Sequence, residues 1–179
     1  MLAMFASAAV GQKVKPKKTE PVKPKKAEQV KAGGACSGIN GLTRTEIDAI
    51  LDAHNKARAA VGLPKLKWNC KLADLAQEWA KRGVFEHRAN PVYGENIFVN
   101  IDTGVSAASG VQSWLTEKSF WNNPTAICQK GKVCTHYTQI VWKTTSEIGC
   151  GIHRSGSGKW KLMLVCNYSP AGNAPGKAF

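Results

Sequence analysis

The 179-residue sequence lacks several features that identify common classes of protein. Its six cysteines form no CxxC pair, which argues against a zinc finger or a thioredoxin-like redox site. No apolar run approaches the roughly 20 residues that a membrane-spanning helix needs, so we expect a soluble domain. No Ser or Cys stands in a recognisable nucleophile motif, which argues against hydrolysis through a covalent intermediate.

Acidic residues are also scarce, with 12 Asp and Glu against 25 Lys and Arg, and the formal net charge is +13. Residues 13–31 hold eight of the lysines, around a nearly identical octad repeat, VKPKKTEP followed by VKPKKAEQ. Prolines and like charges deny this segment a core, so we predict a disordered Lys/Pro-rich linker over residues 13–35. The linker is either a solvated spacer or a tether to an anionic membrane or cell wall.

The even number and wide spacing of the cysteines favour three disulfides and therefore an oxidising, extracellular location. This location argues against a nucleic-acid partner. Residues 1–12 contain a short apolar run that ends in Ala-x-Ala, without a basic segment before it. We interpret them as the remnant of an export signal, with an ordinary N-terminus as the alternative.

One cysteine pair is predicted from its position in a hairpin. If the last hairpin turns about Gly158, residues equally distant from this glycine face each other, and Cys150 and Cys166 are such residues. Their Cα separation would then suit a disulfide.

The other four cysteines lie outside this hairpin. Cys128 and Cys134 enclose a short glycine-containing loop that a disulfide can close. Cys36 is then left to bond Cys70, which would hold the start of the domain onto its second helix. Each of the three bridges would contribute roughly 2–4 kcal/mol on the chain-entropy model.

The first half of the domain shows helical patterns. Thr43, with Glu46 three residues later, forms a capping box before apolar residues at helical spacing. Asn69 caps a second amphipathic segment, and residues 105–120 are predicted to form a third helix. The apolar stripes of the first two helices need a partner layer.

The second half changes to the patterns typical of strands. We predict strands over residues 137–142, 147–153 and 161–168, and an earlier short strand over residues 93–101. Helices followed by an antiparallel meander indicate an α+β fold. The expected architecture is a three-layer α-β-α sandwich with a central, mostly antiparallel sheet.

Six sequence motifs resemble those of the CAP superfamily, which comprises the cysteine-rich secretory, antigen 5 and pathogenesis-related 1 proteins. In order, they are AHNxxR at 53–58, WNxxLA at 68–73, GENI at 94–97, WxxE at 114–117, HYTQIVW at 136–142 and CNYxPxGN at 166–173. The pattern is most similar to the plant and fungal pathogenesis-related 1 branch. The resemblance implies a CAP domain over residues 36–173 and a C-terminal tail over residues 174–179.

The resemblance also implies a central cleft lined by two histidines and two acidic residues. In this sequence they are His87, Glu95, Glu117 and His136. His54 is the rival candidate for the first histidine. The four side chains could bind Zn²⁺ or another divalent cation, with imidazoles as ligands and a carboxylate orienting a bound water. They could equally satisfy one another as a polar cluster.

An aromatic, proline-containing loop is tethered by the predicted Cys128–Cys134 disulfide. Its candidate lipid-binding residues are Phe120, Trp121, Pro124 and Ile127. These side chains either cap the core or form an apolar lip for a sterol or fatty-acid-like lipid. The resemblance supports the second interpretation, because pathogenesis-related and yeast members of the family bind sterols.

We therefore predict a secreted, monomeric CAP-domain protein that binds a sterol or another lipid. It would act in defence, virulence or interaction between organisms. A metal-dependent hydrolase that uses the four cleft residues is the alternative from another class, and we favour a non-enzymatic role. A third hypothesis is a precursor whose C-terminal peptide, after the CNY motif, is released as a signal.

Overall fold

The computed structural model describes residues 40–89, 91–155, 157–175 and 178–179. The helices are α1 (Arg44–Ala59), α2 (Cys70–Ala80), α3 (Ala107–Leu115) and α4 (Thr135–Ile140). The strands of the main sheet are β1 (Lys67–Trp68), β2 (Gly94–Asn100), β5 (Glu147–Arg154) and β6 (Leu162–Ser169). The 3-10 turn η1 (Thr116–Phe120) leads into a separate hairpin of β3 (Trp121–Asn122) and β4 (Ile127–Cys128).

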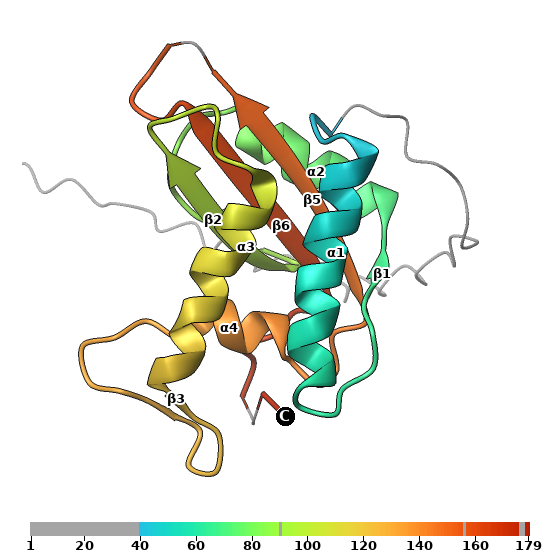
Figure 1. Ribbon diagram of the computed structural model, residues 1–179, viewed down its shortest axis with the longest axis vertical. Helices are drawn as coiled ribbons and strands as arrows, with labels where there is room; N and C mark the ends of the chain where they lie inside the picture. The colour runs from blue at the N-terminus through green and yellow to red at the C-terminus, as the bar shows by residue number, and fades with distance from the viewer. Residues whose placement is uncertain (1–39, 90, 156, 176–177) are drawn as a thin grey trace, which may run out of the picture. The chain divides into compact units, whose positions relative to one another are not determined.

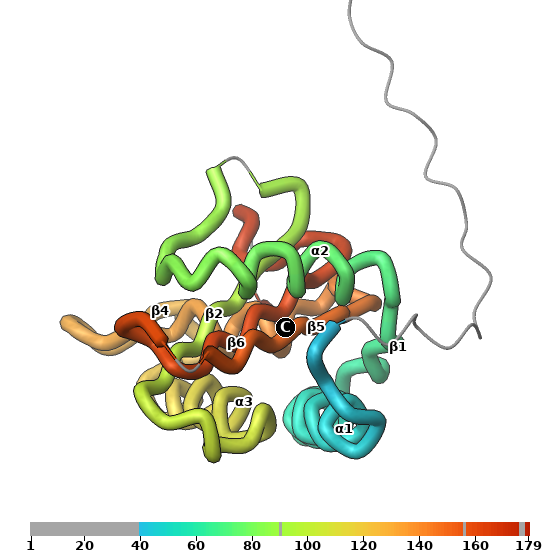
Figure 2. The backbone as a smooth tube through the Cα atoms, turned by 90° about the horizontal axis from the view of Figure 1, so that it is seen from above, coloured from blue at the N-terminus to red at the C-terminus, as the bar shows by residue number. Residues whose placement is uncertain are grey.

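The main sheet lies between two layers of helices (Figure 1). Its strand order is β1-β5-β6-β2; β6 is antiparallel to both β5 and β2, whereas β1 runs parallel to β5. Figure 2 shows α2 on one face of the sheet, with α1 and α3 side by side on the other. The predicted α+β sandwich about a mostly antiparallel sheet is thereby confirmed.

Both helix starts that the sequence predicts with a capping residue are present. Thr43 Oγ1 accepts a hydrogen bond from the Glu46 amide at 3.2 Å, and the Glu46 carboxylate accepts one from the Thr43 amide at 2.9 Å. Asn69 Oδ1 accepts a hydrogen bond from the Leu72 amide at 3.2 Å. These side chains satisfy amides that the first turn of a helix leaves without intrahelical partners.

Alternate residues of β6 face the two helical layers. Leu164 belongs to a buried apolar cluster that includes Ile50 of α1 and Trp114 of α3. Met163 and Val165 belong to a second cluster, which includes alanines of α2. Because successive side chains of a strand point to opposite faces, one strand supplies both cores.

Helix α2 packs closely on β5 because glycines stand where β5 faces it. A Cβ atom at Gly149 would lie 2.2 Å from the Ala73 amide nitrogen, and one at Gly151 would lie 2.3 Å from the Gln77 amide nitrogen. Cys150, between them, points to the other face and joins the larger apolar cluster. The Gly-Cys-Gly order of β5 therefore serves close helix packing on one face and a disulfide on the other.

Two of the predicted disulfides are present. Cys150 stands directly opposite Cys166 in the β5–β6 ladder, with Cα atoms 4.1 Å apart, and the two sulfurs are bonded. The second disulfide joins Cys128 to Cys134, whose Cα atoms are 5.9 Å apart. Both pairings are confirmed.

Some predictions concern residues that the structure does not describe. Cys36 is among them, so the bridge from Cys36 to Cys70 stays a prediction. The assignments of residues 1–12 to an export signal and of residues 13–35 to a linker also fall outside the described residues. Within the part that is described, no helix is long and apolar enough to cross a membrane.

The expected strand over residues 137–142 is wrong, because this segment forms most of α4 and the turn after it. Its aromatic and β-branched residues favour a strand locally, but tertiary contacts favour the helix. Glu117 accepts hydrogen bonds from amides in the first turn of α4, and Arg58 donates one to the carbonyl of Ile140, its last residue. Strand β5 has β6 on one edge, and on its other edge it pairs with the two-residue strand β1 and not with residues 137–142.

The predicted third helix, over residues 105–120, is shorter than expected. Helix α3 begins after Ser106, whose hydroxyl accepts a hydrogen bond from the Ser109 amide at 3.2 Å, and it ends at Leu115. The chain then tightens into η1. Glu117 therefore lies in a 3-10 turn, from which it reaches α4.

The last residues of the chain pack against the domain. Ala178 is fully buried, and its carbonyl accepts a hydrogen bond from the Lys143 amide at 2.6 Å. Phe179 packs against the larger apolar cluster. A peptide released from this end would first have to leave the core.

Gly151→Ala should destabilise the domain, because the added methyl group would meet the backbone of Gln77 and push α2 away from β5. We expect the free energy of unfolding to fall by about 1–3 kcal/mol or more in denaturant titrations of the oxidised protein. Gly104→Ala is the matched control, because the nearest atoms to its Cβ belong to the Asp102 side chain, at 3.3 Å or more. Equal losses in the two variants would contradict the close packing of α2 on β5.

Candidate functional site

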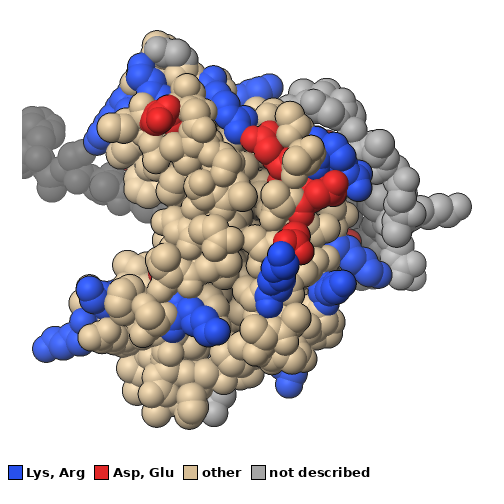
Figure 3. Space-filling model, in the orientation of Figure 1, with Lys and Arg blue, Asp and Glu red and all other residues tan. Residues whose placement is uncertain are grey.

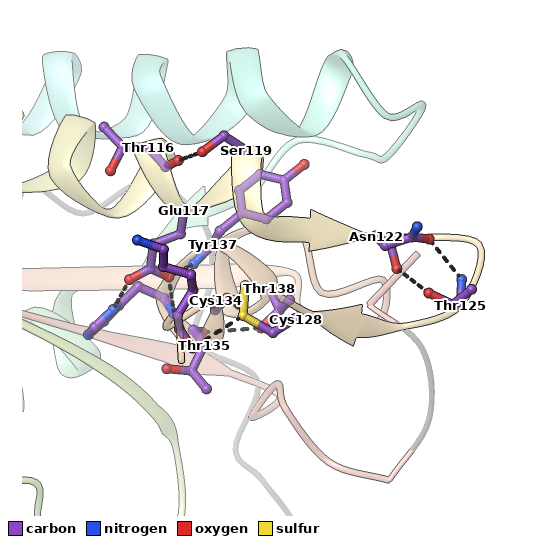
Figure 4. The surroundings of a disulfide bond; sticks show 12 residues. Thr116, Glu117, Ser119, Asn122, Thr125, Cys128, Cys134, Thr135, Tyr137 and Thr138 are labelled. Atoms are coloured by element: carbon purple, nitrogen blue, oxygen red, sulfur yellow. Dashed lines mark hydrogen bonds and ion pairs between the residues drawn. A yellow bond between two sulfur atoms is a disulfide. The ribbon is translucent and has the colours of Figure 1, made fainter. Parts of the chain in front are cut away.

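His136 and Glu117 form a hydrogen-bonded pair at the start of α4. Figure 4 shows the Glu117 side chain directed at the first turn of this helix. His136 Nδ1 lies 2.5 Å from Glu117 Oε1, and Glu117 Oε2 accepts from the His136 and Tyr137 amides at 3.0 and 3.1 Å. The Trp114 ring stacks on the His136 ring with centroids 6.0 Å apart. Three elements, α3, η1 and α4, thus hold this imidazole in one orientation.

His87 and Glu95 form a second pair of the same kind. His87 Nδ1 lies 2.9 Å from Glu95 Oε1, which also accepts from the Arg88 amide at 3.2 Å. Arg88 Nε lies 3.2 Å from Glu95 Oε2, as an ion pair. The Glu95 side chain is 2% exposed, whereas that of His87 is 60% exposed. The buried carboxylate is therefore matched by a guanidinium, and the imidazole beside it stays open to solvent.

In both pairs the carboxylate selects the tautomer of the imidazole. An ionised carboxylate can only accept hydrogen bonds, so Nδ1 of each histidine carries the proton. In the neutral ring, Nε2 then keeps its lone pair. A carboxylate bound to one ring nitrogen commonly orients the other nitrogen toward a metal ion. Each histidine can therefore offer Nε2 to a divalent cation.

In the structure the four predicted cleft residues form two pairs, His87 with Glu95 and His136 with Glu117. Glu95 stands opposite Asn167 in the β2–β6 ladder, and both line a cavity of about 260 Å³ beside α2. The next residue, Asn96, faces the other side of β2 and donates a hydrogen bond to the His136 carbonyl at 3.1 Å. Among the described residues, no three His, Cys, Asp or Glu side chains are grouped to hold a metal ion. One metal group made of all four residues stays a prediction.

His54, the rival candidate, is a buried structural residue. Its Nδ1 lies 2.8 Å from the Ile50 carbonyl and its Nε2 lies 2.9 Å from the Tyr168 hydroxyl. Burial lowers the pKa of His54 to about 4, so the ring is neutral at physiological pH. Because both ring nitrogens are engaged inside the protein, His54 is not placed to act as a metal ligand.

A hydrogen-bond chain connects His54 with the start of α4. The Tyr168 hydroxyl accepts from Asn96 Nδ2 at 3.2 Å, and the same amide group donates to the His136 carbonyl. The four residues that this hydrogen-bond chain links lie in four of the six sequence motifs. Asn96 and Tyr168 were not among the predicted site residues, although a polar side chain in a buried strand is a signal for such a role. Arg88, the ionic partner of Glu95, was also missed.

The four candidate lipid-binding residues lie at the end of η1 and in the β3–β4 hairpin. Phe120 and Trp121 are half-buried, and Trp121 packs against the larger apolar cluster. Pro124 is exposed, and Ile127 is 62% exposed. Val133, in the loop closed by the Cys128–Cys134 disulfide, is 56% exposed. The hairpin therefore covers part of the core and also presents apolar side chains to solvent.

A cavity of about 300 Å³ opens between α1 and α3, beside η1. The residues that line it are mostly apolar or aromatic, but two lysines and a glutamine are among them: Ala53, Ala57, Leu115, Tyr137, Lys56, Lys118 and Gln112. Tyr137 comes from α4, so the same short helix contributes to this cavity and carries His136.

Comparison with known proteins places this architecture in a family. Residues 51–168 match the sequence model of CAP, the cysteine-rich secretory protein family. The chain belongs to the CAP family. A pathogenesis-related protein of PR-1 type from Sambucus nigra is 37% identical over 131 residues, which are 71% of this chain and 77% of that protein.

Several solved structures have the same fold. Venom allergen-like protein 4 of Schistosoma mansoni aligns with a TM-score of 0.63 and 29% identity, over 77% of this chain and 95% of that one. NaASP2, in a crystal structure with Zn²⁺, aligns with a TM-score of 0.65 and 26% identity, over 80% and 88% of the two chains.

The CAP domain should lose stability below pH 6.5 through His54. The pKa of this residue is about 4 in the folded protein, against 6.5 for an ordinary histidine. Between pH 4 and 6.5, His54 binds a proton in the unfolded chain but stays neutral in the folded domain. The stabilisation is complete above pH 6.5 and declines as the pH falls toward 4, by at most about 1.4 kcal/mol per pH unit.

Denaturant titrations of the wild type and of His54→Gln, at a series of pH values, test this expectation. The free energy of unfolding should fall more steeply with acidification in the wild type. His153→Gln is the control, since His153 is partly exposed on β5 and this variant should keep the wild-type slope. Parallel curves for the wild type and His54→Gln would refute the assignment.

Proposed function

We propose that this CAP protein is secreted and binds a sterol or a fatty-acid-like lipid. The observation that carries the proposal is the disulfide-tethered β3–β4 region, which exposes Pro124, Ile127 and Val133 beside half-buried aromatic rings. Exposed apolar side chains on a hairpin and on the disulfide-closed loop after it are typical of an interaction site. Two disulfides and membership of a secretory family support the extracellular location.

The hairpin offers polar contacts as well as apolar surface. Trp121 Nε1 is buried and has no hydrogen-bond partner among the described residues, so a ligand hydroxyl could satisfy it only after a shift of the hairpin exposed this atom. The Lys132 ammonium lies 4.8 Å from the centroid of the Phe120 ring. An apolar wall with a few placed polar groups is the usual composition of a small-molecule site.

The cavity between α1 and α3 is suited to an acyl chain. Its volume of about 300 Å³ is at the lower end of the range that ligand pockets span. Ala53, Ala57 and Leu115 supply apolar walls, and the Lys118 ammonium could pair with a fatty-acid carboxylate. The hairpin and this cavity are thus two candidate subsites for different parts of a lipid or for different lipids.

Binding of Zn²⁺ or another divalent cation by His87 and His136 is a second proposal. The support is that both histidines are bonded to a carboxylate through Nδ1, which leaves Nε2 as the ligand atom. The related NaASP2 structure contains Zn²⁺. Two imidazoles provide half of a tetrahedral shell, so waters would complete it and the affinity would be below that of a four-ligand structural site.

The other hypotheses have weaker support. A bound metal would supply an activated water, which the hydrolase alternative needs, and Glu95 and Glu117 would serve by orienting the imidazoles. Release of a C-terminal signalling peptide would have to free Ala178 from the core. A role in defence, virulence or interaction between organisms fits a secreted relative of PR-1 proteins, and the Lys-rich segment would add a tether to an anionic surface.

Sterol binding should be saturable and should depend on the hairpin. Ile127→Asp places a charge on an exposed apolar surface, so the affinity for radiolabelled cholesterol should fall about tenfold or more. Ile101→Asp is the matched control, because Ile101 is 74% exposed but lies on the loop after β2. An absence of saturable uptake by the wild type, or equal affinity of the two variants, would overturn the assignment.

Calorimetric titration with Zn²⁺ at neutral pH tests the metal proposal. If one ion bridges the two histidines, His87→Ala and His136→Ala should each abolish binding; two independent sites would instead lose half of the stoichiometry in each variant. His153→Ala, which removes a histidine outside both pairs, is the control. Unchanged binding in both single variants would exclude these ligands. Acidification should weaken binding, because metal and proton compete for Nε2.

A further inference from the structure

A group of basic and aromatic residues lies where α2 ends and at the turn between β5 and β6. The basic aromatic patch, as we define it, consists of Lys81, Arg82, Val84, Phe85, Lys159 and Trp160. In Figure 3, lysine and arginine side chains are visible at the end of the molecule that carries the β5–β6 turn and also elsewhere on this face, whereas α2 lies on the far side of the sheet (Figure 2). None of these residues belongs to the hairpin or to the α1–α3 cavity discussed above.

Trp79 of α2 organises the basic side of the patch. Its indole Nε1 donates a hydrogen bond to the Glu86 carbonyl at 2.8 Å, which holds the segment after α2 in place. The guanidinium groups of Arg82 and Arg88 lie 4.3 and 5.2 Å from the Trp79 ring centroid. Arg88 is paired with Glu95, whereas Arg82 is exposed to solvent. A cation–π contact therefore orients an exposed positive charge.

Phe85 joins this segment to the β5–β6 turn. The Phe85 and Trp160 rings meet edge to face with centroids 5.8 Å apart, and Lys159 Nζ lies 4.9 Å from the Trp160 ring centroid. Phe85 is nevertheless 53% exposed, and Val84 beside it is 43% exposed. Apolar side chains are thus held at the surface among cations.

We propose that the basic aromatic patch binds the surface of a bilayer that contains anionic phospholipids. Aromatic and aliphatic side chains enter the boundary between headgroups and acyl chains, while Lys and Arg are attracted to anionic headgroups. The formal net charge of +13 adds long-range attraction. Glu86 is an exposed carboxylate in the same segment, but the cations of the patch outnumber it.

A soluble polyanion is the other ligand that such a charge could attract. It would contact Arg82 and Lys159 but would leave Val84 and Phe85 in water. A bilayer surface would contact both the cations and the apolar side chains of the patch, whereas a polyanion would contact the cations alone. The exposed apolar side chains therefore favour the bilayer. The ligand is a membrane surface rather than one lipid molecule, and the inference therefore stands apart from the proposed lipid-binding function.

Cosedimentation of the full-length protein with vesicles tests the proposal. Vesicles of phosphatidylcholine mixed with phosphatidylserine should bind the wild type, and vesicles of phosphatidylcholine alone should bind it more weakly. Arg82→Gln and Phe85→Ser should each lower the affinity for the mixed vesicles about fivefold. Val84→Ser tests the apolar contribution without touching the Phe85–Trp160 contact. Lys71→Gln, at the opposite end of α2, removes the same charge as Arg82→Gln and should bind as the wild type does.

Each remaining outcome would overturn the proposal. Failure of the wild type to bind mixed vesicles would contradict it. Equal binding of all variants would also contradict it, and would assign the vesicle binding to the Lys-rich N-terminal segment. Weakened binding in Arg82→Gln with normal binding in both Val84→Ser and Phe85→Ser would indicate a purely electrostatic polyanion site. Cholesterol uptake should be normal in Arg82→Gln, and vesicle binding normal in Ile127→Asp, so the membrane and sterol proposals fail separately.

Discussion

The guanidinium of Arg58 is buried in the domain and donates hydrogen bonds to four backbone carbonyl oxygens. They belong to Pro64, Ile140, Trp142 and Thr145. A helix as short as α4 is not stable by itself in water, so its position depends on such contacts. Burial lowers the pKa of Arg58, yet a guanidinium stays charged, and this charge favours the carbonyl end of a helix. Arg58 therefore helps to hold the C-terminal end of α4 in place.

The opposite end of α4 is held by groups of the candidate site itself. Glu117 accepts hydrogen bonds from its amides, and Asn96 donates to the His136 carbonyl while it also bonds the Tyr168 hydroxyl. Asn96 and Tyr168 are buried, where an unmade hydrogen bond is costly, and together with the partly buried Glu117 they favour one arrangement of α4 against the sheet. His136 and Tyr137 then occupy fixed places, one beside Glu117 and the other in the α1–α3 cavity. The proposed metal and lipid functions therefore share one scaffold.

Local signals in the sequence predicted most of the fold, because helix caps and strand alternation involve only neighbouring residues. The Cys150–Cys166 pairing needed only the position of a turn. Residues 137–142 show the limit of such signals, since their composition favours a strand and contacts from Arg58 and Glu117, distant in the chain, favour a helix. The family motifs likewise supplied the histidines and glutamates of the candidate site, but they did not predict that these residues would form two pairs.

The sequence by itself therefore determined the family, the layered α+β class, two disulfides and the residue types available for binding. Only the tertiary structure decided that His54 is buried and neutral, and that Glu95 pairs with Arg88 as well as with His87. It also decided that Phe85 stands exposed against Trp160. The reason is physical: burial, charge pairing and ring contacts arise between segments far apart in the chain, and their energies depend on distances that no local pattern encodes.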